Sequence, residues 1–366
     1  MAAFDDGTFF LSANPTLAPY GQAGGGPARP EVLAFSRANL GAGFRTLLPH
    51  WDGTPKFTEH SYRTFASDGP NRELLLFQNV GDTHAEWTFL DREGQWSARG
   101  QLVWPWGAEY DQPKPVRICY PTVMLKDRAV FFCGVSDVLE PYQQWRDYKK
   151  QLTGRDWDYD FRRLFFTWSR DIRSGKFQPW VEIASRDKTA GWIFPGDLWV
   201  ATDGLVHVIW TERAIDERLR EKFFPKAQQT HALNYAAIRE GQVLLRRTLA
   251  EAREGRSGEV PSSPRFQVTA ENRLIVFFFV QGTNAVGQTV AENRLMEIGP
   301  DGGTSVPVRI DLKQPFTAGF TATVRAGSPP SDTLEILGQQ MGHQNTMRYA
   351  RIHLFARANT DVQNDR

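Results

Sequence analysis

The sequence predicts an all-β chain folded as a β-propeller, and two observations carry that prediction. The stretch Phe57–Pro105 contains four short runs of β-forming residues, each bounded by Gly, Pro, Asp or Asn. Four consecutive strands of this length are what one propeller blade requires. Similar sets of runs recur along the chain at intervals of roughly 45–75 residues, as expected when propeller blades carry loop insertions.

The first clear blade shows the pattern best. Its four runs lie at Ser61–Phe65, Glu73–Gln78, Ala85–Leu90 and Gly100–Val103. The turn between the third and fourth runs, DREGQW, has Asp and Gly at hairpin positions. We therefore expect Trp96, at the end of this turn, to fold back onto the sheet.

The remaining runs group into four later sets and one earlier set. These sets occupy Cys119–Ile183, Gly196–Thr248, Arg265–Leu312, the shorter Phe320–Leu354 and a degenerate N-terminal stretch, Gly7–Leu48. The count predicts six four-stranded antiparallel blades, with seven as the alternative. No Pro- or Ser-rich linker divides the chain, so we expect one domain over residues 1–358, followed by a disordered polar tail at 359–366.

Composition excludes several classes of function. The chain has 366 residues and a formal net charge of +1, which gives no general attraction to nucleic acid or to an anionic membrane. No run of apolar residues is long enough to span a bilayer. The N-terminus lacks the features of a signal peptide, so we expect either a secreted or periplasmic protein whose signal is absent from this sequence or, alternatively, a cytoplasmic one.

The two cysteines, Cys119 and Cys133, fall on neighbouring predicted strands joined by a turn near Lys126. A cross-strand disulfide is one interpretation, and two reduced thiols in the core are the favoured one. No His pattern accompanies them, so they do not predict a zinc site. We expect no cofactor, and the sequence leaves a structural metal ion open.

Propeller geometry converts sequence position into location. The start of each innermost strand and the loop between the second and third strands lie on one face, around the mouth of the central channel, where ligand sites collect. Three of these second-to-third loops are long, and loops of that length are usually functional or disordered. Four of the seven histidines map to the same face: His60, His84, His231 and His343.

These residue types suit proton abstraction beside a carboxylate. Arg provides a permanently charged fork for the carboxylate, and a neutral His or an ionised Tyr removes the proton from the adjacent carbon. That is β-elimination on a uronic acid. By position, the predicted catalytic residues are His60, His84, Arg117 and Tyr120. The predicted substrate-binding residues at the mouth are Tyr62, Trp145, Asp197, His231, Arg265 and His343.

Three segments then resemble a known family. The chain resembles the BNR-repeat propellers of ulvan and rhamnose-glucuronate lyases and the related propeller α-rhamnosidases. The similar segments are HSYRTFASDGPNRELLLFQ with a following His, WTFLDREGQWS and PVRICYPTVMLKDRAVFF. In that family a His-Ser/Thr-Tyr motif opens one blade, matched here by His60-Ser61-Tyr62. A second His follows, matched by His84, and an Arg-Pro-Tyr-like strand opens the next blade.

The resemblance covers roughly residues 55–250. It implies a calcium-independent lyase, or a related glycosidase, that acts on rhamnose–glucuronate linkages. The chain departs from the family at the third motif, where two residues separate Arg117 from Tyr120. The family's downstream catalytic Arg has no clear counterpart, so the candidates for binding the substrate carboxylate are Arg117, Arg146 and Arg170.

Two alternatives to a lyase stay open. A propeller glycoside hydrolase, similar to the α-rhamnosidases, would need two carboxylates about 5–10 Å apart. A non-catalytic carbohydrate-binding propeller would need aromatic and hydrogen-bonding side chains only. In each case we expect a monomer whose partner is a polysaccharide or oligosaccharide.

Overall fold

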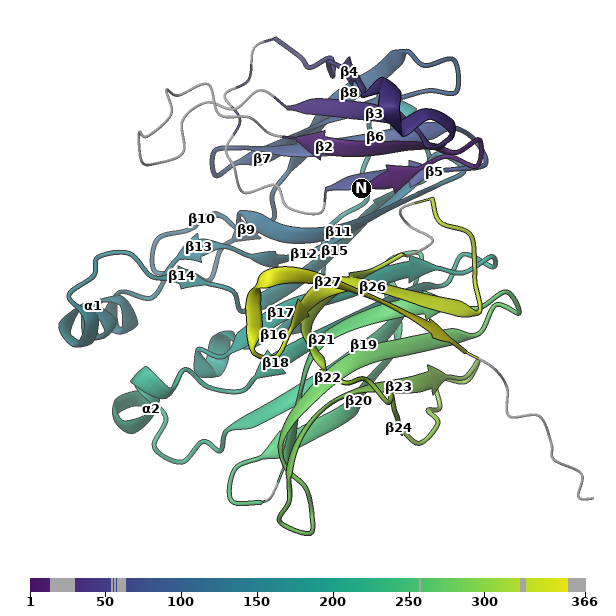
Figure 1. Cartoon of the computed structure of the whole chain (residues 1–366). Coiled ribbons are helices and arrows are strands. Elements are labelled where there is room, and N and C mark those ends of the chain that lie inside the picture. Colours follow the sequence, from purple (N-terminus) through teal and green to yellow (C-terminus); the bar gives the residue numbers. More distant parts are fainter. Residues whose placement is uncertain are drawn as a thin grey trace, which may run out of the picture.

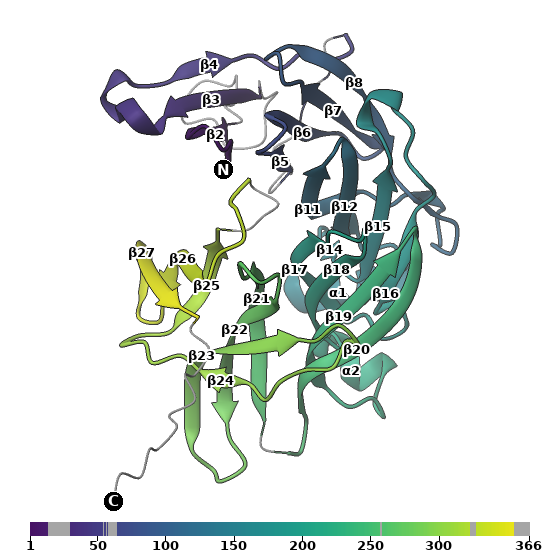
Figure 2. The ribbon, with the colours of Figure 1, turned by 90° about the vertical axis from the view of Figure 1, so that its right-hand side faces the viewer.

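The structure is a computed structural model that describes residues 1–13, 30–53, 55, 57, 64–256, 258–322 and 327–354. Within these ranges the chain forms six antiparallel sheets of three or four strands that follow one another in sequence order (Figure 1). Figure 2 shows the sheets arranged around a common axis, from the purple N-terminal sheet to the yellow C-terminal one. The predicted all-β propeller with six blades is therefore confirmed.

Each blade runs from an inner strand to an outer strand. Blade 1 contains β1 (Ala2–Ala3), β2 (Thr8–Ala13), β3 (Glu31–Ser36) and β4 (Arg45–Leu47). Blade 2 contains β5 (Phe65–Asp68), β6 (Glu73–Val80), β7 (His84–Leu90) and β8 (Trp96–Val103). Blade 3 contains β11 (Ile118–Lys126), β12 (Ala129–Ser136), β15 (Arg163–Ser169) and β16 (Val181–Ser185).

The C-terminal half repeats the plan. Blade 4 contains β17 (Trp192–Val200), β18 (Val206–Arg213), β19 (Thr230–Arg239) and β20 (Gln242–Arg253). Blade 5 contains β21 (Glu259–Val268), β22 (Leu274–Thr283), β23 (Thr289–Ile298) and β24 (Val308–Arg309). Blade 6, as far as it is described, has three strands: β25 (Phe316–Thr321), β26 (Thr333–Gln340) and β27 (His343–His353).

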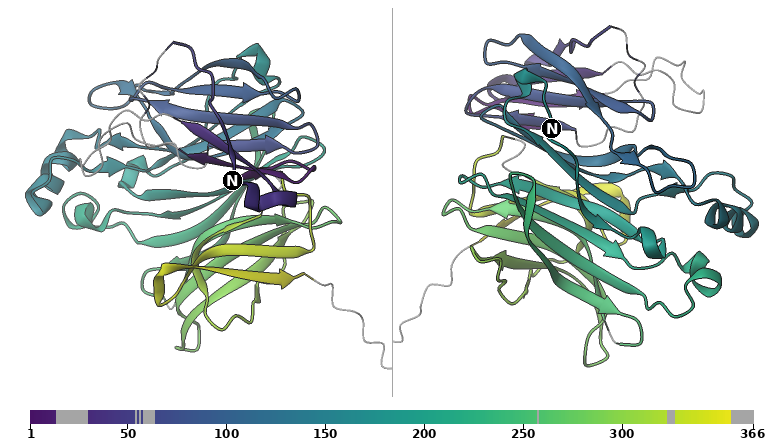
Figure 3. Two further views of the ribbon diagram at one scale, coloured as in Figure 1. Left: turned by 45° about the horizontal axis from the view of Figure 1, so that its top comes forward. Right: turned by 180° about the vertical axis from the view of Figure 1, so that it is seen from behind.

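One face of the ring carries the long insertions. In each blade the start of the inner strand pairs with the end of the second strand, as Ile118 does with Ser136, so the second-to-third connections share a face. This face, called the upper face below, bears the helices α1 (Gln143–Thr153) and α2 (Glu217–Phe223). Two short strand pairs lie there as well: β9 (Trp106–Gly107) with β10 (Lys114–Pro115), and β13 (Val138–Leu139) with β14 (Tyr159–Asp160). Both helices project from the same side of the molecule in the two views of Figure 3.

Helix α2 lies inside a strongly charged segment of the chain. Asp216 caps it by accepting a hydrogen bond from the backbone N–H of Arg218. Helix α1 lies in one of the long second-to-third connections, which the sequence predicts as loops. Its Gln, Arg, Lys and Leu residues are good helix formers, and Gly154 ends it in the left-handed conformation that favours glycine. The two helices pack together through Trp145 on Phe224 and Tyr148 on Phe223.

Large side chains fill the space between neighbouring blades. Trp87, Trp210 and Tyr235 are almost completely buried in two of the clusters that join the blades. Trp96 packs onto the cluster between blades 1 and 2, as the turn sequence predicted. High aromatic content is thus mainly a property of the core.

Glycine is required where the sixth blade meets the first. Gly327 follows β25 with a φ of +83°, and any side chain on it would collide with the carbonyl oxygen of Ala3 in β1. Both the positive φ and the close approach exclude other residues. On the other side of blade 6, Asn293 of β23 donates to the carbonyl of Phe316 and accepts from its N–H.

The two cysteines are free and buried, which agrees with the favoured interpretation. They do not face each other, because Cys119 pairs with Val135 and Cys133 pairs with Thr122. Within the described ranges, neither α-helix is long and apolar enough to cross a membrane.

Candidate functional site

A hollow opens on the upper face between blades 4 and 5. Three neighbouring strands of blade 4 place Trp192, Arg213 and His231 directly beside one another, because Arg213 pairs with Trp192 on one side and with His231 on the other. Directly opposed residues in antiparallel strands project to the same side of the sheet. The register therefore builds a row of an indole, a guanidinium and an imidazole.

The other wall of the hollow comes from blade 5. Val260, Pro261 and Ser262 at the start of β21 face the row across a volume of about 270 Å³. That volume approaches the lower end of the range for small-ligand pockets. The hollow lies on the upper face, the face for which the sequence predicts a ligand site.

Arg213 is the unusual member of the row. Its guanidinium lies over the indole of Trp192, with the central carbon 5.2 Å from the ring centroid. Its Nε atom is buried and has no hydrogen-bond acceptor among the described residues. No described carboxylate forms an ion pair with Arg213. A cation in this state offers an anionic ligand a strong charge-assisted hydrogen bond.

His231 is kept in its neutral form. Burial lowers its pKa from the ordinary value of 6.5, and the nearby charge of Arg213 lowers it further, while Glu217 acts in the opposite direction. A neutral imidazole can accept a proton at neutral pH. The row thus combines a carboxylate-binding cation with a proton acceptor.

Aromatic rings extend from the hollow toward blade 3. Trp192 lies 4.8 Å from Phe161, measured between ring centroids, and Phe161 lies 5.7 Å from Tyr120. Tyr120 is also 6.5 Å from Phe194, which lines the hollow and is 40% exposed. Exposed ring faces of this kind suit the apolar face of a sugar.

Tyr120 occupies a bulge in β11, with a positive φ of 48°. A non-glycine residue rarely adopts this conformation, and bulges are frequent beside active sites. Tyr120, predicted from the sequence as an acid or base, therefore lies close to the Arg213 row through Phe194.

Arg117 and His84 form a second cluster, over blades 2 and 3. The Arg117 guanidinium is buried and pairs with Asp82 at 2.9 Å and Asp137 at 3.1 Å. These two carboxylates already neutralise it, which leaves it poorly suited to clamp a substrate carboxylate. Two residues beyond Asp82, His84 has its Nε2 3.4 Å from the buried Glu86 carboxylate and its Nδ1 2.8 Å from the Thr83 hydroxyl.

Asp197 and Arg265, predicted to bind substrate, tie blade 4 to blade 5. Asp197 accepts a hydrogen bond of 3.1 Å from the backbone N–H of Phe266, and Arg265 donates one of 3.1 Å to the carbonyl of Gly196. Both side chains are buried. This reciprocal tie holds together the two walls of the hollow.

Other predicted residues lie apart from the hollow. Trp145 packs on helix α1 against Tyr142 and Phe224, and the Arg162 guanidinium lies 5.1 Å from its ring centroid. His343 is exposed at the start of β27 in blade 6. His60 and Tyr62 lie outside the described residues.

A buried acidic cluster lies beneath helix α1. Asp160 and Asp187 both approach the Nε atom of Arg162, at 2.8 and 3.4 Å, and Tyr142 donates a 3.4 Å hydrogen bond to Asp187. Burial, with help from the Asp160 charge, raises the pKa of Asp187 to about 7. Asp187 is therefore a carboxyl group that can hold a proton near neutral pH.

Sequence reasoning missed Arg213, Trp192 and Phe194. The usable signal was position, because Arg213 ends the second strand of blade 4 and Trp192 begins the first. The sequence predicts an inner strand of blade 4 that begins at Gly196, whereas β17 begins at Trp192, so Trp192 and Phe194 lay outside the predicted strand. Arg213 fell in the predicted second-to-third loop, and its place beside Trp192 and His231 follows only from the strand register. No group of three or more His, Cys, Asp or Glu in the described part of the chain is arranged to hold a metal ion.

No protein-family model and no curated protein matches this chain. Among solved structures, the chain matches a polysaccharide lyase of family PL25, an ulvan lyase with a bound GlcA(1-4)Rha3S ligand, with a TM-score of 0.50 and 10% sequence identity. The match covers 96% of this chain and 77% of the lyase. An α-L-arabinofuranosidase of Fusarium graminearum, with an iminosugar inhibitor, matches with a TM-score of 0.50 and 11% identity, covering 96% and 91%. The likeness is one of fold. BNR repeats remain a prediction from the sequence.

The reciprocal tie generates a stability prediction. Asp197→Ala leaves the buried N–H of Phe266 without its acceptor, so we expect the free energy of unfolding to fall by about 1–3 kcal/mol. Urea unfolding followed by tryptophan fluorescence measures this. The matched control is Asp203→Ala, an exposed Asp of the same blade that pairs with Arg239, for which we expect a loss below about 1 kcal/mol. Equal losses in the two variants would contradict a structural role for Asp197.

Proposed function

We propose that this protein is a carbohydrate-active enzyme that cleaves a uronate-containing polysaccharide by β-elimination on its upper face. The observation that carries the proposal is the row of Arg213 and His231 in one hollow, with Trp192 and Phe194 beside them. The row supplies what elimination needs: a cation without a carboxylate partner among the described residues and a neutral base.

The reaction follows from the chemistry of each group. Arg213 binds the uronate carboxylate and reduces its negative charge, which makes the proton on the adjacent carbon, C5, more acidic. His231 takes that proton. The electron pair forms a C4=C5 double bond as the C4–O bond breaks, and the leaving oxygen is protonated. Tyr120 is our candidate proton donor, because it reaches this hollow through Phe194.

His60 and His84 stay in the proposal as the residues that the family resemblance indicates. His84 lies on the same face as the hollow, at the start of β7. It would orient the substrate from the side of blade 2, while Arg213 and His231 act from blades 4 and 5. A long polymer would lie across the mouth and contact both sides.

The comparisons support the broad class. Both matching propellers are named as enzymes of carbohydrate chemistry, one a polysaccharide lyase and the other an arabinofuranosidase. They do not choose between elimination and hydrolysis. A secreted location, a monomeric state and the absence of a cofactor remain parts of the proposal.

A glycoside hydrolase is the second candidate, and Asp187 favours it. A hydrolase needs one carboxyl group that is protonated at working pH and a second one nearby that is ionised. Asp187, with a pKa of about 7, fits the first role, and Asp160 lies beside it at Arg162. A binding protein without activity is the third candidate, because aromatic rings at the mouth suffice for it.

A panel assay separates the three candidates. Purified protein is incubated with ulvan, rhamnoglucuronans, gum arabic and pectins while absorbance at about 235 nm and reducing ends are followed together, since elimination alone leaves an unsaturated, absorbing uronate. A rise in both establishes a lyase. New reducing ends without a rise in absorbance would overturn the lyase proposal in favour of a hydrolase. If neither signal rises, the binding-protein candidate is tested next by glycan-binding measurements.

The first variant test addresses the row. We expect His231→Ala to lower kcat by about 100-fold to 10,000-fold, the range for loss of a general base. Arg213→Gln should lower kcat/KM on uronate polymers because the carboxylate loses its partner. Arg239→Gln, which changes an exposed Arg at the opposite end of β19, is the control and should be active. If His84→Ala or His60→Ala abolishes activity while His231→Ala is unaffected, the reaction centre lies on blade 2 instead.

The second test is the pH profile. A base must be unprotonated, and the pKa of His231 is lowered, so the acidic limb of kcat/KM should fall below pH 6.5. Arg213→Gln removes a positive neighbour, the pKa of His231 rises, and the limb should move to higher pH in whatever activity remains. An unchanged limb in Arg213→Gln would show that another group is the base.

The third test concerns Asp187. If the enzyme eliminates, Asp187→Asn should retain the absorbance signal at about 235 nm, because the reaction needs no second carboxyl group. If it hydrolyses, the same variant should lose its reducing-end signal, since the proton donor is gone. Circular dichroism of the variant checks that the Arg162 cluster still supports the fold.

A further inference from the structure

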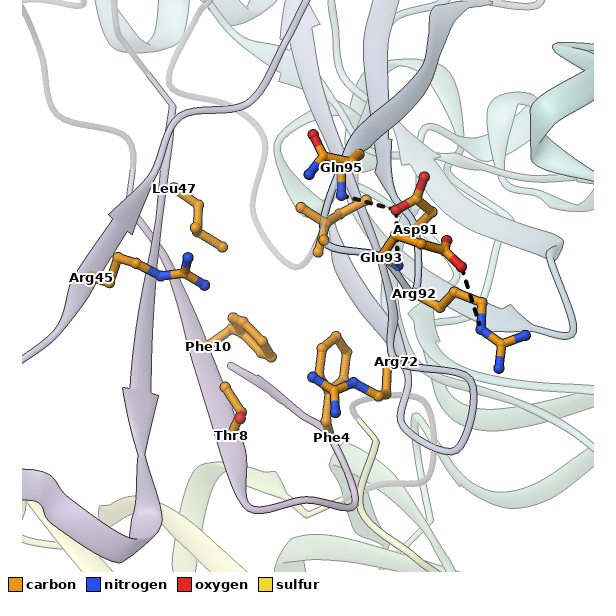
Figure 4. A pocket seen from close by; sticks show the side chains of 12 residues that line it. Phe4, Thr8, Phe10, Arg45, Leu47, Arg72, Asp91, Arg92, Glu93 and Gln95 are labelled. Atoms are coloured by element: carbon orange, nitrogen blue, oxygen red, sulfur yellow. Dashed lines mark hydrogen bonds and ion pairs between the residues drawn. The ribbon is translucent and has the colours of Figure 1, made fainter.

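A second hollow lies on the face opposite the upper face, between blades 1 and 2. The turns before β2 and β6 and the hairpin between β7 and β8 surround it, with a volume of about 310 Å³. Figure 4 shows the side chains that line it. None of the residues proposed for catalysis lies here, so this hollow is separate from the reaction site.

The floor of the hollow is apolar and tightly packed. Phe4 and Phe10 meet edge to face, with ring centroids 4.6 Å apart, and both are buried. Leu90 is buried next to them, and Leu47 of β4 is partly buried on the blade 1 side. Because these side chains belong to the core between the two blades, the floor is a fixed surface.

The charges around the rim are nearly all paired. Arg72 forms a 2.9 Å ion pair with Asp6. Asp91 accepts hydrogen bonds from the backbone N–H groups of Glu93 and Gln95, which satisfies its carboxylate within its own turn. Arg92 pairs with Glu93, and both turn toward the outside of the hairpin (Figure 4).

Arg45 is the exception. It is exposed, and no described carboxylate pairs with it. Figure 4 shows its guanidinium extending from blade 1 over the space beside Phe10, across from Arg72 on blade 2. One uncompensated positive charge therefore stands beside an apolar floor, and a second guanidinium faces it.

We propose that this hollow binds an organic carboxylate with a ring-sized apolar body. The carboxylate would pair with Arg45, whose planar fork suits bidentate contact. The apolar body would lie over the floor and displace water from Leu47, the apolar residue of the floor that is not buried. A bare inorganic anion would satisfy Arg45 but leave that floor wet, which is why the structure favours an organic acid.

The site would also join the two blades. A ligand held between Arg45 of β4 and the β5–β6 turn at Arg72 contacts blade 1 and blade 2 together. A ligand that binds only the folded form raises the free energy of unfolding, by an amount that grows with the logarithm of ligand concentration above its Kd. Occupancy should therefore raise the melting temperature.

The experiment uses benzoate as the probe and the full-length chain. Isothermal titration calorimetry is run with benzoate, with benzamide as its neutral analogue, and with sulfate as a bare anion. We expect benzoate to bind in the millimolar range, of the order seen for fragments of this size. Benzamide and sulfate should each bind at least about tenfold more weakly, a factor that corresponds to one lost interaction of about 1.4 kcal/mol.

Variants then locate the site. Arg45→Gln should weaken benzoate binding at least about tenfold and remove the rise in melting temperature. Arg348→Gln, an exposed Arg on β27, is the matched control and should bind normally. Turnover should be unchanged in both variants, so this test is independent of the proposed enzymatic function.

Three results would overturn the proposal. These are equal affinity for benzoate and benzamide, an unaffected affinity in Arg45→Gln, and sulfate binding as tight as benzoate binding. The first two remove the role of Arg45, and the third shows a simple anion site without use of the apolar floor. Absence of heat with benzoate up to about 20 mM, well above the millimolar range expected for such a fragment, also rejects it.

Discussion

The candidate site depends on a reciprocal pair of hydrogen bonds between blades 4 and 5. Asp197 of blade 4 accepts from the backbone of blade 5, and Arg265 of blade 5 donates to the backbone of blade 4. Each blade thus supplies a buried charged side chain to the other at the bulge in its inner strand. Such buried groups are costly when a partner is lost, so they fix the spacing of the blades. That spacing sets the width of the hollow that contains Arg213 and His231.

The contrast between two arginines explains where ligand chemistry is available. Arg117 and Arg213 are both at the ends of strands on the upper face. Arg117 meets two carboxylates, Asp82 and Asp137, and serves to hold blades 2 and 3 together. Arg213 meets an indole and no described carboxylate. A guanidinium without a counter-charge is available to a ligand, and the fold has kept one beside a histidine whose pKa burial has lowered.

The sequence predicted the ring well and the site only in part. Period-two runs and Gly- or Asp-containing turns are local signals, so most strands of blades 2 to 6 and the turn before Trp96 were found. The inner strand of blade 2 was predicted at Ser61–Phe65, whereas β5 occupies Phe65–Asp68. Distances between blades are not local. Nothing near Asp197 in the sequence indicates that its partner is the N–H of Phe266, and a position at the mouth alone made it resemble a binding residue. His231 was found because it ends a long loop, whereas Arg213 was missed because only register reveals that it stands beside His231.

Helices α1 and α2 are insertions in adjacent blades, 3 and 4, and they pack against each other. Besides the aromatic contacts, Lys149 of α1 lies 3.4 Å from Asp216 at the start of α2, and Arg218 reaches Asp158 at 2.8 Å. The strands of blades 3 and 4 pair only with one another, and neither helix takes part in their sheets. The two insertions therefore pack as a single unit. A design that changes what this face binds should replace the two insertions together. Replacing one alone would leave buried charges without partners and aromatic rings exposed on the other.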